Sequence, residues 1–400
     1  MKKVAIIGAG ASGLLCAIFC SKNGLDVDVF EQNSKCGKKI LVSGNGRCNI
    51  TNTEFSPNDY FSENQSFCKY ALETFSFKDF QKFCSSIGLH LDIKNDGKVY
   101  PQSNEAKSVV TLLENYAKHL GVQFHLNTRV SNLSEVQSRY DSVVVATGSE
   151  AAPHLGGNED GVQFAQSLQH TYIPTYPSLV QLELEGQLYS KMNGSKVYGE
   201  VTLLINNKKH DTKAGDILFT NYGVSGFAIL DISQAASEAL RDYQMVDLSL
   251  NLLPKFNNQT LSSYILKMKE LYPQMTLLDI IHGLLPLKIS TTLVESLGFS
   301  SSDRLETINT KTSKKIANQI LNWKFHVTQT HGFRHAEVSG GGVNTLEINP
   351  KTFESYKEKN IYFIGEVLDV VGRRGGFNFA WAWASAYCCS IALQENLETL

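Results

Sequence analysis

The sequence lacks several features that define whole classes of protein. Its 8 cysteines form no C-x-x-C pair, which excludes the usual zinc and thioredoxin-like spacings. Only 9 prolines and 30 glycines occur in 400 residues, too few for a collagen-like or linker-rich architecture. No charge of one sign dominates, because 37 basic and 39 acidic side chains give a net charge of −2. This balance argues against a protein that coats polyanions and makes a nucleic-acid partner unexpected.

Long uninterrupted apolar runs are also lacking. Residues 4–21 and 375–394 carry no charge, but glycines 8, 10 and 13 interrupt the first stretch and Asn378 lies within the second. We therefore expect both to be buried elements, with no membrane association. A long chain with few cysteines is typical of a reducing compartment, which predicts a cytoplasmic protein, and no spacing predicts a metal site.

What is present is an ordinary globular composition, with 42% hydrophobic and 19% charged residues. A length of 400 residues suggests two or three domains. Residues 3–32 are typical of a β-α-β unit, with strands at 3–7 and 25–31 around a helix at 11–23. Further strands are expected at 141–146 and 361–364, and each ends in glycine. These segments predict one α/β sheet that is assembled from distant parts of the chain.

The middle of the chain has a different pattern. Residues 179–205 and 213–220 alternate apolar and polar side chains as antiparallel strands do. We expect helices at 233–241, 261–271 and 311–323, and a strand at 325–338. The predicted organisation is an FAD-binding domain over 1–175 and 336–400, a β-rich inserted domain over 176–232 and 300–335, and a helical subdomain over 233–299.

The first chemical motif is Gly8-Ala9-Gly10-Ala11-Ser12-Gly13, a G-x-G-x-x-G pattern between a strand and a helix. Gly8 permits the tight turn, Gly10 lets a pyrophosphate approach the backbone, and Gly13 lets the helix pack closely on the sheet. Glu31 ends the next strand, where an acid accepts hydrogen bonds from a ribose. The combination predicts dinucleotide binding, and an acid at 31 favours a ribose without a 2′-phosphate.

Residues 37–49 form a second motif, a basic and glycine-rich stretch that we expect to be a loop. An NAD-binding Rossmann domain needs no such loop. FAD is longer and needs backbone donors along its pyrophosphate, ribityl chain and ring, so the loop favours FAD. An ordinary solvated loop is the alternative.

With these blocks, the chain resembles the BaiN-like flavoproteins, also called NAD(P)/FAD-dependent oxidoreductases or aminoacetone-oxidase-family FAD-binding enzymes. The resemblance spans nearly the whole chain. It also rests on the motifs GKVYP at 97–101, ATG at 146–148, GDILFT at 215–220, GVSG at 223–226, GGGV at 340–343, GEVLD at 365–369, GGFN at 375–378 and WAW at 381–383.

The resemblance implies a two-dinucleotide-binding-domain FAD fold, interrupted by a β-barrel-like domain and a helical domain. The family commonly has a second glycine after Thr147-Gly148, where this chain has Ser149. Residues 365–366 would hold the ribityl and pyrophosphate region, and the helix that opens at 375–378 would point its dipole at the flavin edge. Trp381 and Trp383 are expected to be buried core residues.

The candidate cofactor-binding residues come from these motifs and from the resemblance. They are Gly8, Gly10, Ala11, Ser12, Gly13, Glu31, Gln32, Lys38, Lys39, Ser43, Gly44, Gly46, Arg47, Cys48, Asn49, Val130, Ala146, Thr147, Gly148, Gly365, Glu366, Asp369, Gly375, Gly376, Phe377 and Asn378.

Catalytic residues are less clear. Arg47 or Arg373 would stabilise charge beside the ring or bind an acidic substrate. His331, Arg334 and His335, on a strand expected to enter a turn at 340–343, would bind a carboxylate or move a proton, although solvated strand residues are the simpler interpretation. Tyr222 is a similar candidate. Cys48 adjoins the predicted flavin loop, which suggests a redox role, but no partner cysteine lies at the spacing of disulfide reductases, so we expect none.

The predicted function is FAD-dependent hydride transfer between a small-molecule substrate and flavin N5. NAD(P)H would serve at most as a transient donor, because no second G-x-G-x-x-G lies in the middle of the chain. An oxidase or dehydrogenase of small amines and a reductase of activated double bonds both stay open. The alternatives are a flavin-dependent RNA-modifying enzyme and a non-enzymatic flavin sensor.

Overall fold

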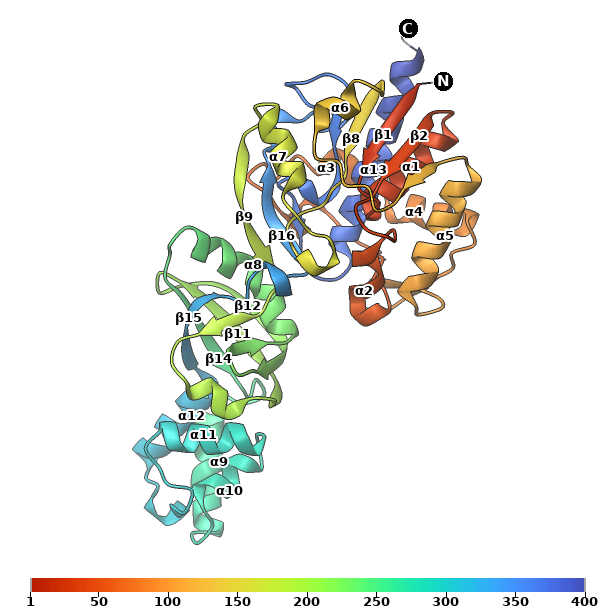
Figure 1. Ribbon diagram of the computed structural model, residues 1–400. Coiled ribbons are helices and arrows are strands. Elements are labelled where there is room, and N and C mark those ends of the chain that lie inside the picture. Colours follow the sequence, from red (N-terminus) through yellow and green to blue (C-terminus); the bar gives the residue numbers. More distant parts are fainter. Residues whose placement is uncertain (1, 399–400) are drawn as a thin grey trace. The chain divides into compact units, whose positions relative to one another are not determined.

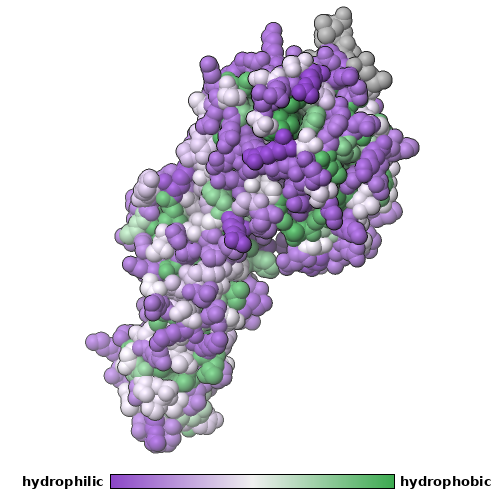
Figure 2. Space-filling view, in the orientation of Figure 1, coloured by the Kyte–Doolittle hydropathy of each residue, from purple (hydrophilic) through white to green (hydrophobic). Residues whose placement is uncertain are grey.

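The chain folds into two compact units, described here from a computed structural model that covers residues 2–398. Unit 1 comprises residues 1–176 and 337–400, and unit 2 comprises residues 177–336. Each unit has its own hydrophobic core. Apolar side chains therefore show only as scattered patches on the face seen in Figure 2.

Unit 1 is built on a five-stranded sheet in the order β17-β8-β1-β2-β7, and every pairing in it is parallel. The strands are β1 (Lys3–Ile7), β2 (Asp26–Phe30), β7 (Gln123–His125), β8 (Ser142–Val145) and β17 (Ile361–Phe363). The Val- and Ile-rich runs of β1 and β8 are buried, as both faces of a parallel sheet require. The expected Rossmann-like sheet is thus confirmed, and its strands come from both ends of the chain (Figure 1).

Helices cover this sheet. Helix α1 (Ala11–Lys22) packs against both α5 (Ala106–His119) and α13 (Phe377–Glu398). Trp381 and Trp383 of α13 are each only 1% exposed, which confirms them as core residues. The other helices of unit 1 are α2 (Lys38–Gly46), α3 (Lys69–Thr74), α4 (Phe77–Ser86), α6 (Leu133–Gln137) and α7 (Asp160–Ser167).

Three small sheets complete unit 1. They pair β16 with β9, β18 with β4, and the central β6 with both β3 and β5. The strands are β3 (Thr51–Asn52), β4 (Tyr60–Phe61), β5 (Leu91–Ile93), β6 (Lys98–Pro101), β9 (Tyr172–Ser178), β16 (Val338–Val343) and β18 (Val371–Gly372).

Unit 2 contains the expected inserted barrel, closed in the order β10-β13-β12-β11-β14-β15. Its strands are β10 (Leu182–Leu184), β11 (Lys196–Ile205), β12 (Lys208–Phe219), β13 (Gly223–Ser225), β14 (Val246–Asn251) and β15 (Trp323–Thr330). Neighbouring strands are antiparallel, so alternate side chains fill the interior. Helix α8 (Phe227–Arg241) packs on β11 and β12.

The helical part of unit 2 is inserted between barrel strands β14 and β15. It contains α9 (Asn258–Leu271), α10 (Leu277–His282), α11 (Leu287–Ser296) and α12 (Thr310–Leu321). Side-chain caps fix where α9 and α10 start, because Asn257 and Thr276 each accept a hydrogen bond from the backbone three residues on. The helical subdomain expected over 233–299 is corrected here. That range includes β14, and the helical part continues to Leu321.

The strand expected over 325–338 is also corrected. Strand β15 ends at Thr330, and residues 333–335 form a 3₁₀ turn, so Arg334 and His335 do not lie on a strand. The glycines at 340–342 lie inside β16 and not in a turn. Gly341 and Gly342 have positive φ angles, which the apolar alternation of a strand does not reveal. Across residues 2–398, no helix has the length and apolar character needed to cross a bilayer.

Candidate functional site

The motifs of unit 1 meet at one edge of the parallel sheet. The register pairs Ile7 with Phe30 and with Val145, and Val145 with Phe363. Four parallel strands therefore end at the same level. Since each motif follows one of these ends directly, residues 8–13, Glu31, 146–148 and 365–366 all lie at the carboxyl edge, where open α/β sheets bind ligands.

The three glycines of the first motif have different roles. A Cβ on Gly8 would lie 2.4 Å from the Ala146 carbonyl oxygen, and one on Gly13 would lie 1.9 Å from the Gly8 carbonyl oxygen. Both positions therefore need glycine for packing. A Cβ on Gly10 would meet nothing within 4 Å, so open space lies above this part of the backbone. That space, at the N-terminus of α1, fits the approach of a phosphate group.

Glu31 is held in place by three hydrogen bonds. Its Oε2 accepts from the Ala9 backbone N–H at 2.9 Å, and its Oε1 accepts from the backbone and side-chain N–H groups of Asn33 at 2.8 and 2.7 Å. The side chain is 8% exposed. Lys38 donates to Asn33 Oδ1 at 2.7 Å, which connects the second motif to this carboxylate. Asn33 was not predicted, and its proximity to Glu31 in the sequence was the available signal.

The first part of the second motif is helical and the remainder is irregular, so the expected loop is corrected only in part. Helix α2 spans Lys38–Gly46, but Ser43, Gly44 and Asn45 interrupt it with non-helical backbone angles. Its start is fixed on the first motif, because the Gly37 N–H donates to the Ala9 carbonyl at 2.9 Å. The glycines of this motif thus serve left-handed turns, at Gly37, Gly44 and Gly46.

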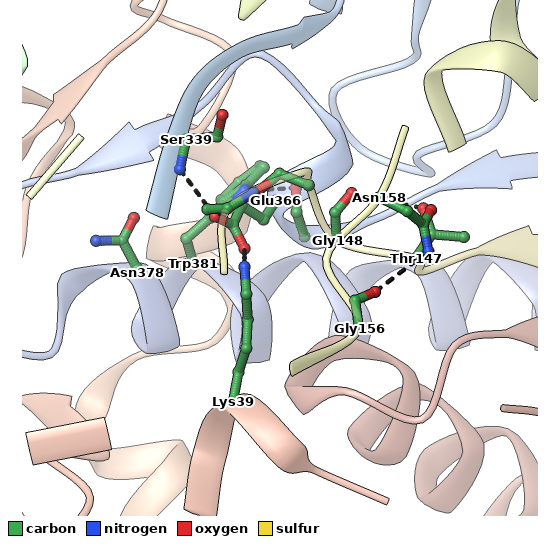
Figure 3. A network of polar contacts seen from close by, with 12 residues as sticks. Lys39, Thr147, Gly148, Gly156, Asn158, Ser339, Glu366, Asn378 and Trp381 are labelled. Atoms are coloured by element: carbon green, nitrogen blue, oxygen red, sulfur yellow. Dashed lines mark hydrogen bonds and ion pairs between the residues drawn. The ribbon is translucent and has the colours of Figure 1, made fainter. Parts of the chain in front are cut away.

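Glu366 is the centre of a polar network (Figure 3). Its carboxylate accepts from Lys39 Nζ at 3.0 Å, from Ser149 Oγ at 2.9 Å and from the Ser339 backbone N–H at 3.0 Å. The pair with Lys39 joins the end of β17 to α2, which are 327 residues apart in sequence. Ser149 and Ser339 were not predicted. The signal for Ser149 was its departure from the family's glycine.

A pocket of about 130 Å³ adjoins Glu366 within unit 1. Burial raises the pKa of Glu150, which lies in its wall and accepts a hydrogen bond from the Thr175 hydroxyl. The wall is made by Gly148, Ser149, Glu150, Asn158, Glu159, Val162, Gln163, Gln166, Tyr172, Thr175, Gly341, Gly342, Glu366 and Val367.

The glycines before α13 are needed by the chain itself. A Cβ on Gly376 would lie 2.2 Å from the Thr51 carbonyl oxygen, and Gly375 accepts a hydrogen bond from Asn52. Asn378 uses both ends of its amide on Gly372, at 2.8 Å each. The amide of Asn378 is thus already bound within the protein before any cofactor contact is made.

Three other predicted side chains also bind within the protein. Asp369 accepts from the Glu63 backbone N–H at 2.9 Å. Arg373 pairs with Asp59 at 2.8 Å and lies over the Phe377 ring. Cys48 is completely buried.

The other predicted cofactor residues of unit 1 lie close to these motifs or make local contacts. Gln32 donates to the Gly156 carbonyl, Ser43 to the Ile40 carbonyl, and Arg47 lies over the Tyr100 ring. Val130 packs against the core, and Asn49 lies against Thr51 and Gly376. Ala11 and Ser12 form the first turn of α1, and Thr147 and Gly148 follow β8.

The thiol of Cys48 is expected to be unreactive in the folded protein. Burial raises its pKa to about 12, against a weaker effect of a hydrogen bond with Ser43, so the nucleophilic thiolate is scarce at neutral pH. Because all eight cysteines are buried, a colorimetric thiol reagent should react with almost none in native protein and with eight after unfolding. Rapid native labelling of Cys48, located by mass spectrometry, would contradict this.

The predicted histidine cluster lies in unit 2. The His331 ring stacks on Tyr222 with centroids 3.7 Å apart and lies 4.2 Å from His335. His331 Nδ1 lies 2.8 Å from Glu183 Oε1, which fixes the ring orientation. The structure thus brings Tyr222, His331 and His335 together, and Glu183 is the member that the sequence did not indicate. Arg334 is exposed beside them.

The edge of unit 1 has the chemistry that a dinucleotide needs. It offers a helix N-terminus over open space at Gly10, a fixed carboxylate at Glu31, and two lysines on α2. These residues fit FAD better than a metal ion. Backbone N–H groups and lysines bind anionic phosphates, and the carboxylates of Glu31 and Glu366 belong to different hydrogen-bond networks and do not converge on one point as metal ligands would.

Comparisons with known proteins agree with this architecture. Residues 2–392 match the family described as HI0933-like protein Rossmann domain. The chain is 33% identical to a ribosomal RNA dihydrouridine synthase of Haemophilus influenzae, covering 98% of both chains. It is 31% identical to a protein of the same name from Escherichia coli, covering 96% of both, and 30% identical to a 3-dehydro-bile acid delta(4,6)-reductase of Clostridium scindens, covering 99% of this chain and all of that protein.

Proposed function

The chain belongs to the HI0933-like family, a family of flavin-dependent oxidoreductases, and from this premise we propose that it reduces a carbon–carbon double bond conjugated to a carbonyl group. FAD is the proposed cofactor, and NAD(P)H is the proposed electron donor. One observation supports the cofactor assignment above all. Strands β1, β2, β8 and β17 end in register, so the dinucleotide-binding motifs that follow them lie at one edge of the sheet.

Residues of unit 1 would hold FAD as follows. Glu31, already oriented by Ala9 and Asn33, would accept hydrogen bonds from the ribose. The backbone at Gly10 and the N-terminus of α1 would receive the pyrophosphate. Lys39 would neutralise phosphate charge, in exchange for its present pairing with Glu366. The N-terminus of α13 would stabilise negative charge on the ring.

When bound and reduced by NAD(P)H, FAD would supply a hydride from N5. The names of the relatives indicate what kind of bond receives it. A 3-dehydro steroid has a ketone at C3 that conjugates with a double bond starting at C4, and the C5–C6 double bond of uridine conjugates with the C4 carbonyl. In both, a hydride adds to the carbon β to the carbonyl and a proton to the α carbon. This shared chemistry supports the proposed reductase over an oxidase of amines.

Anaerobic spectroscopy tests the proposal. The purified protein should show the flavin absorbance bands, and NADH or NADPH should bleach them. A 3-keto-4-ene steroid or a uridine-containing RNA, added without oxygen, should then restore them with formation of the saturated product. The proposal is wrong if neither nucleotide bleaches the flavin, or if a reduced flavin is reoxidised by oxygen alone and by no conjugated alkene.

A second candidate concerns the substrate and not the reaction. Two relatives at 33% and 31% identity are named for ribosomal RNA, and both match nearly the whole chain. These similarities support a uracil base of RNA as the conjugated alkene. The near-neutral net charge of the chain supports a small molecule instead.

A further inference from the structure

Unit 2 contains a long stretch without acidic residues. No aspartate or glutamate occurs from residue 307 to residue 336, although the chain averages about one in ten residues. This is the longest such stretch in the sequence. It still contains Lys311, Lys314, Lys315, Lys324 and Arg334.

The fold exposes all five of these cations, and four of them belong to α12 or to the start of β15. In α12, Ile316, Ala317 and Ile320 are buried, while Lys311, Lys314 and Lys315 are exposed. Lys324 follows at the start of β15, where it is exposed between buried Trp323 and Phe325. We call Lys311, Lys314, Lys315 and Lys324 the lysine face.

Two asparagines extend this surface. Asn318 and Asn322 are exposed at the spacing of i+7 and i+11 from Lys311, with Lys315 at i+4. In a helix the spacing of Lys311, Lys315 and Asn318 keeps their side chains on one side. Asn322 follows the end of α12 and donates its amide N–H to Asn318 Oδ1 at 3.1 Å. The face therefore combines charged donors with an adjoining pair of amide groups.

Several other lysines of unit 2 form ion pairs, whereas the lysine face forms none with residues 2–398. Lys191 pairs with Glu295 at 2.8 Å, Lys196 with Asp216 at 3.2 Å, and Lys213 with Asp211. Within the described part of the chain, no carboxylate lies within 4.0 Å of a lysine-face ammonium group. These charges are available to an external anion.

The net charge of the whole chain conceals this asymmetry. Residues 177–336 contain 16 basic and 14 acidic side chains, a net charge of +2, and the remainder of the chain carries −4. The balance of −2 that argued against a nucleic-acid partner is thus an average over two unlike units.

We propose that the lysine face binds the backbone phosphates of RNA, which rests on the proposed function and assigns its substrate to the RNA class. Lysine is a point-charge ligand for phosphate, and asparagine amides donate to phosphate or sugar oxygens. A lipid surface would need large apolar side chains between the lysines. This face has asparagines there instead.

The test measures the binding of a fluorescein-labelled RNA hairpin to the full-length protein by anisotropy, over a series of salt concentrations. The variant K311Q/K314Q/K315Q/K324Q should bind at least about tenfold more weakly. Its plot of log K against log salt should be shallower by up to about 3, since each neutralised phosphate contributes about 0.7 to 0.9.

A matched control carries the same charge change elsewhere. Lys107, Lys208, Lys209 and Lys359 are also exposed and outside the ion pairs above, so K107Q/K208Q/K209Q/K359Q should bind RNA within about twofold of the parent. Equal losses in both variants would overturn the proposal, as would absence of salt-sensitive RNA binding. Tighter binding to phosphatidylserine vesicles than to RNA would assign the face to membranes instead.

The same samples separate this proposal from the function on which it rests. Bleaching of the flavin by NADH or NADPH should be equal in the parent and in both quadruple variants. If bleaching is intact but the lysine face does not affect RNA binding, the surface assignment is wrong and the reductase stands. If the flavin is never reduced, the proposed function itself fails.

Discussion

Replacing Gly10 with valine should remove FAD and leave the fold intact. The Gly10 backbone is extended at φ −78°, which valine adopts without strain, and a Cβ there meets nothing in the protein within 4 Å. The new side chain would occupy the space that a pyrophosphate needs. We expect flavin occupancy after reconstitution to fall at least about tenfold, which corresponds to a loss of about 1.4 kcal/mol or more.

The thermal midpoint of the apoprotein provides the internal check. It should be unchanged in Gly10→Val, while Gly13→Val should unfold or strongly destabilise the unit because its Cβ would lie 1.9 Å from the Gly8 carbonyl oxygen. Gly283→Ala in unit 2 is a matched control, since Gly283 also has a negative φ. A Gly10→Val protein with full flavin content would place the cofactor elsewhere.

Replacing Glu31 with alanine should reduce both stability and flavin content. The change removes the acceptor of three hydrogen bonds, and the Ala9 N–H would lose its charged partner in a buried position. Hydrogen bonds to charged groups contribute about 1.5–3 kcal/mol, so we expect the free energy of unfolding to fall by about 3 kcal/mol. Urea denaturation of the apoprotein measures this.

A graded series separates the two effects of Glu31. Glu31→Gln keeps one oxygen and should lose less stability than Glu31→Ala, but it should still weaken FAD because it removes a charged ribose acceptor. Glu63→Ala, a change at an exposed carboxylate, should alter neither property. If Glu31→Ala retained parental stability and flavin content, the hydrogen bonds of Glu31 would be irrelevant to the site.

The sequence alone was informative where a feature depends on neighbouring residues. The first motif predicted a strand, a turn and a helix because glycine spacing and apolar runs act within a few residues. The positions of β1, β2, β8 and β17 were expected for the same reason. The burial of Trp381 and Trp383 also agreed with their apolar surroundings.

The sequence was misleading where a contact crosses the chain. Residues 37–49 contain many glycines, yet residues 38–42 are helical, because the start of α2 is fixed to Ala9 and its glycines lie in the kink that follows. Asn378 and Asp369 are predicted to contact the cofactor, and the fold also binds Asn378 to Gly372 and Asp369 to the Glu63 backbone. Such competition between a ligand and the chain cannot be read from local composition.

Local chemistry was thus determined by the sequence, which supplied the glycine turn, the acid at 31 and the basic second motif. Only the tertiary structure decided which groups meet: the level strand ends, the pairing of Lys39 with Glu366 and the contact of His331 with Glu183 join residues up to 327 positions apart. The physical reason is that hydrogen bonds and ion pairs depend on distance in space. Parallel strands need long crossover connections, so residues that are neighbours in space lie far apart along the chain.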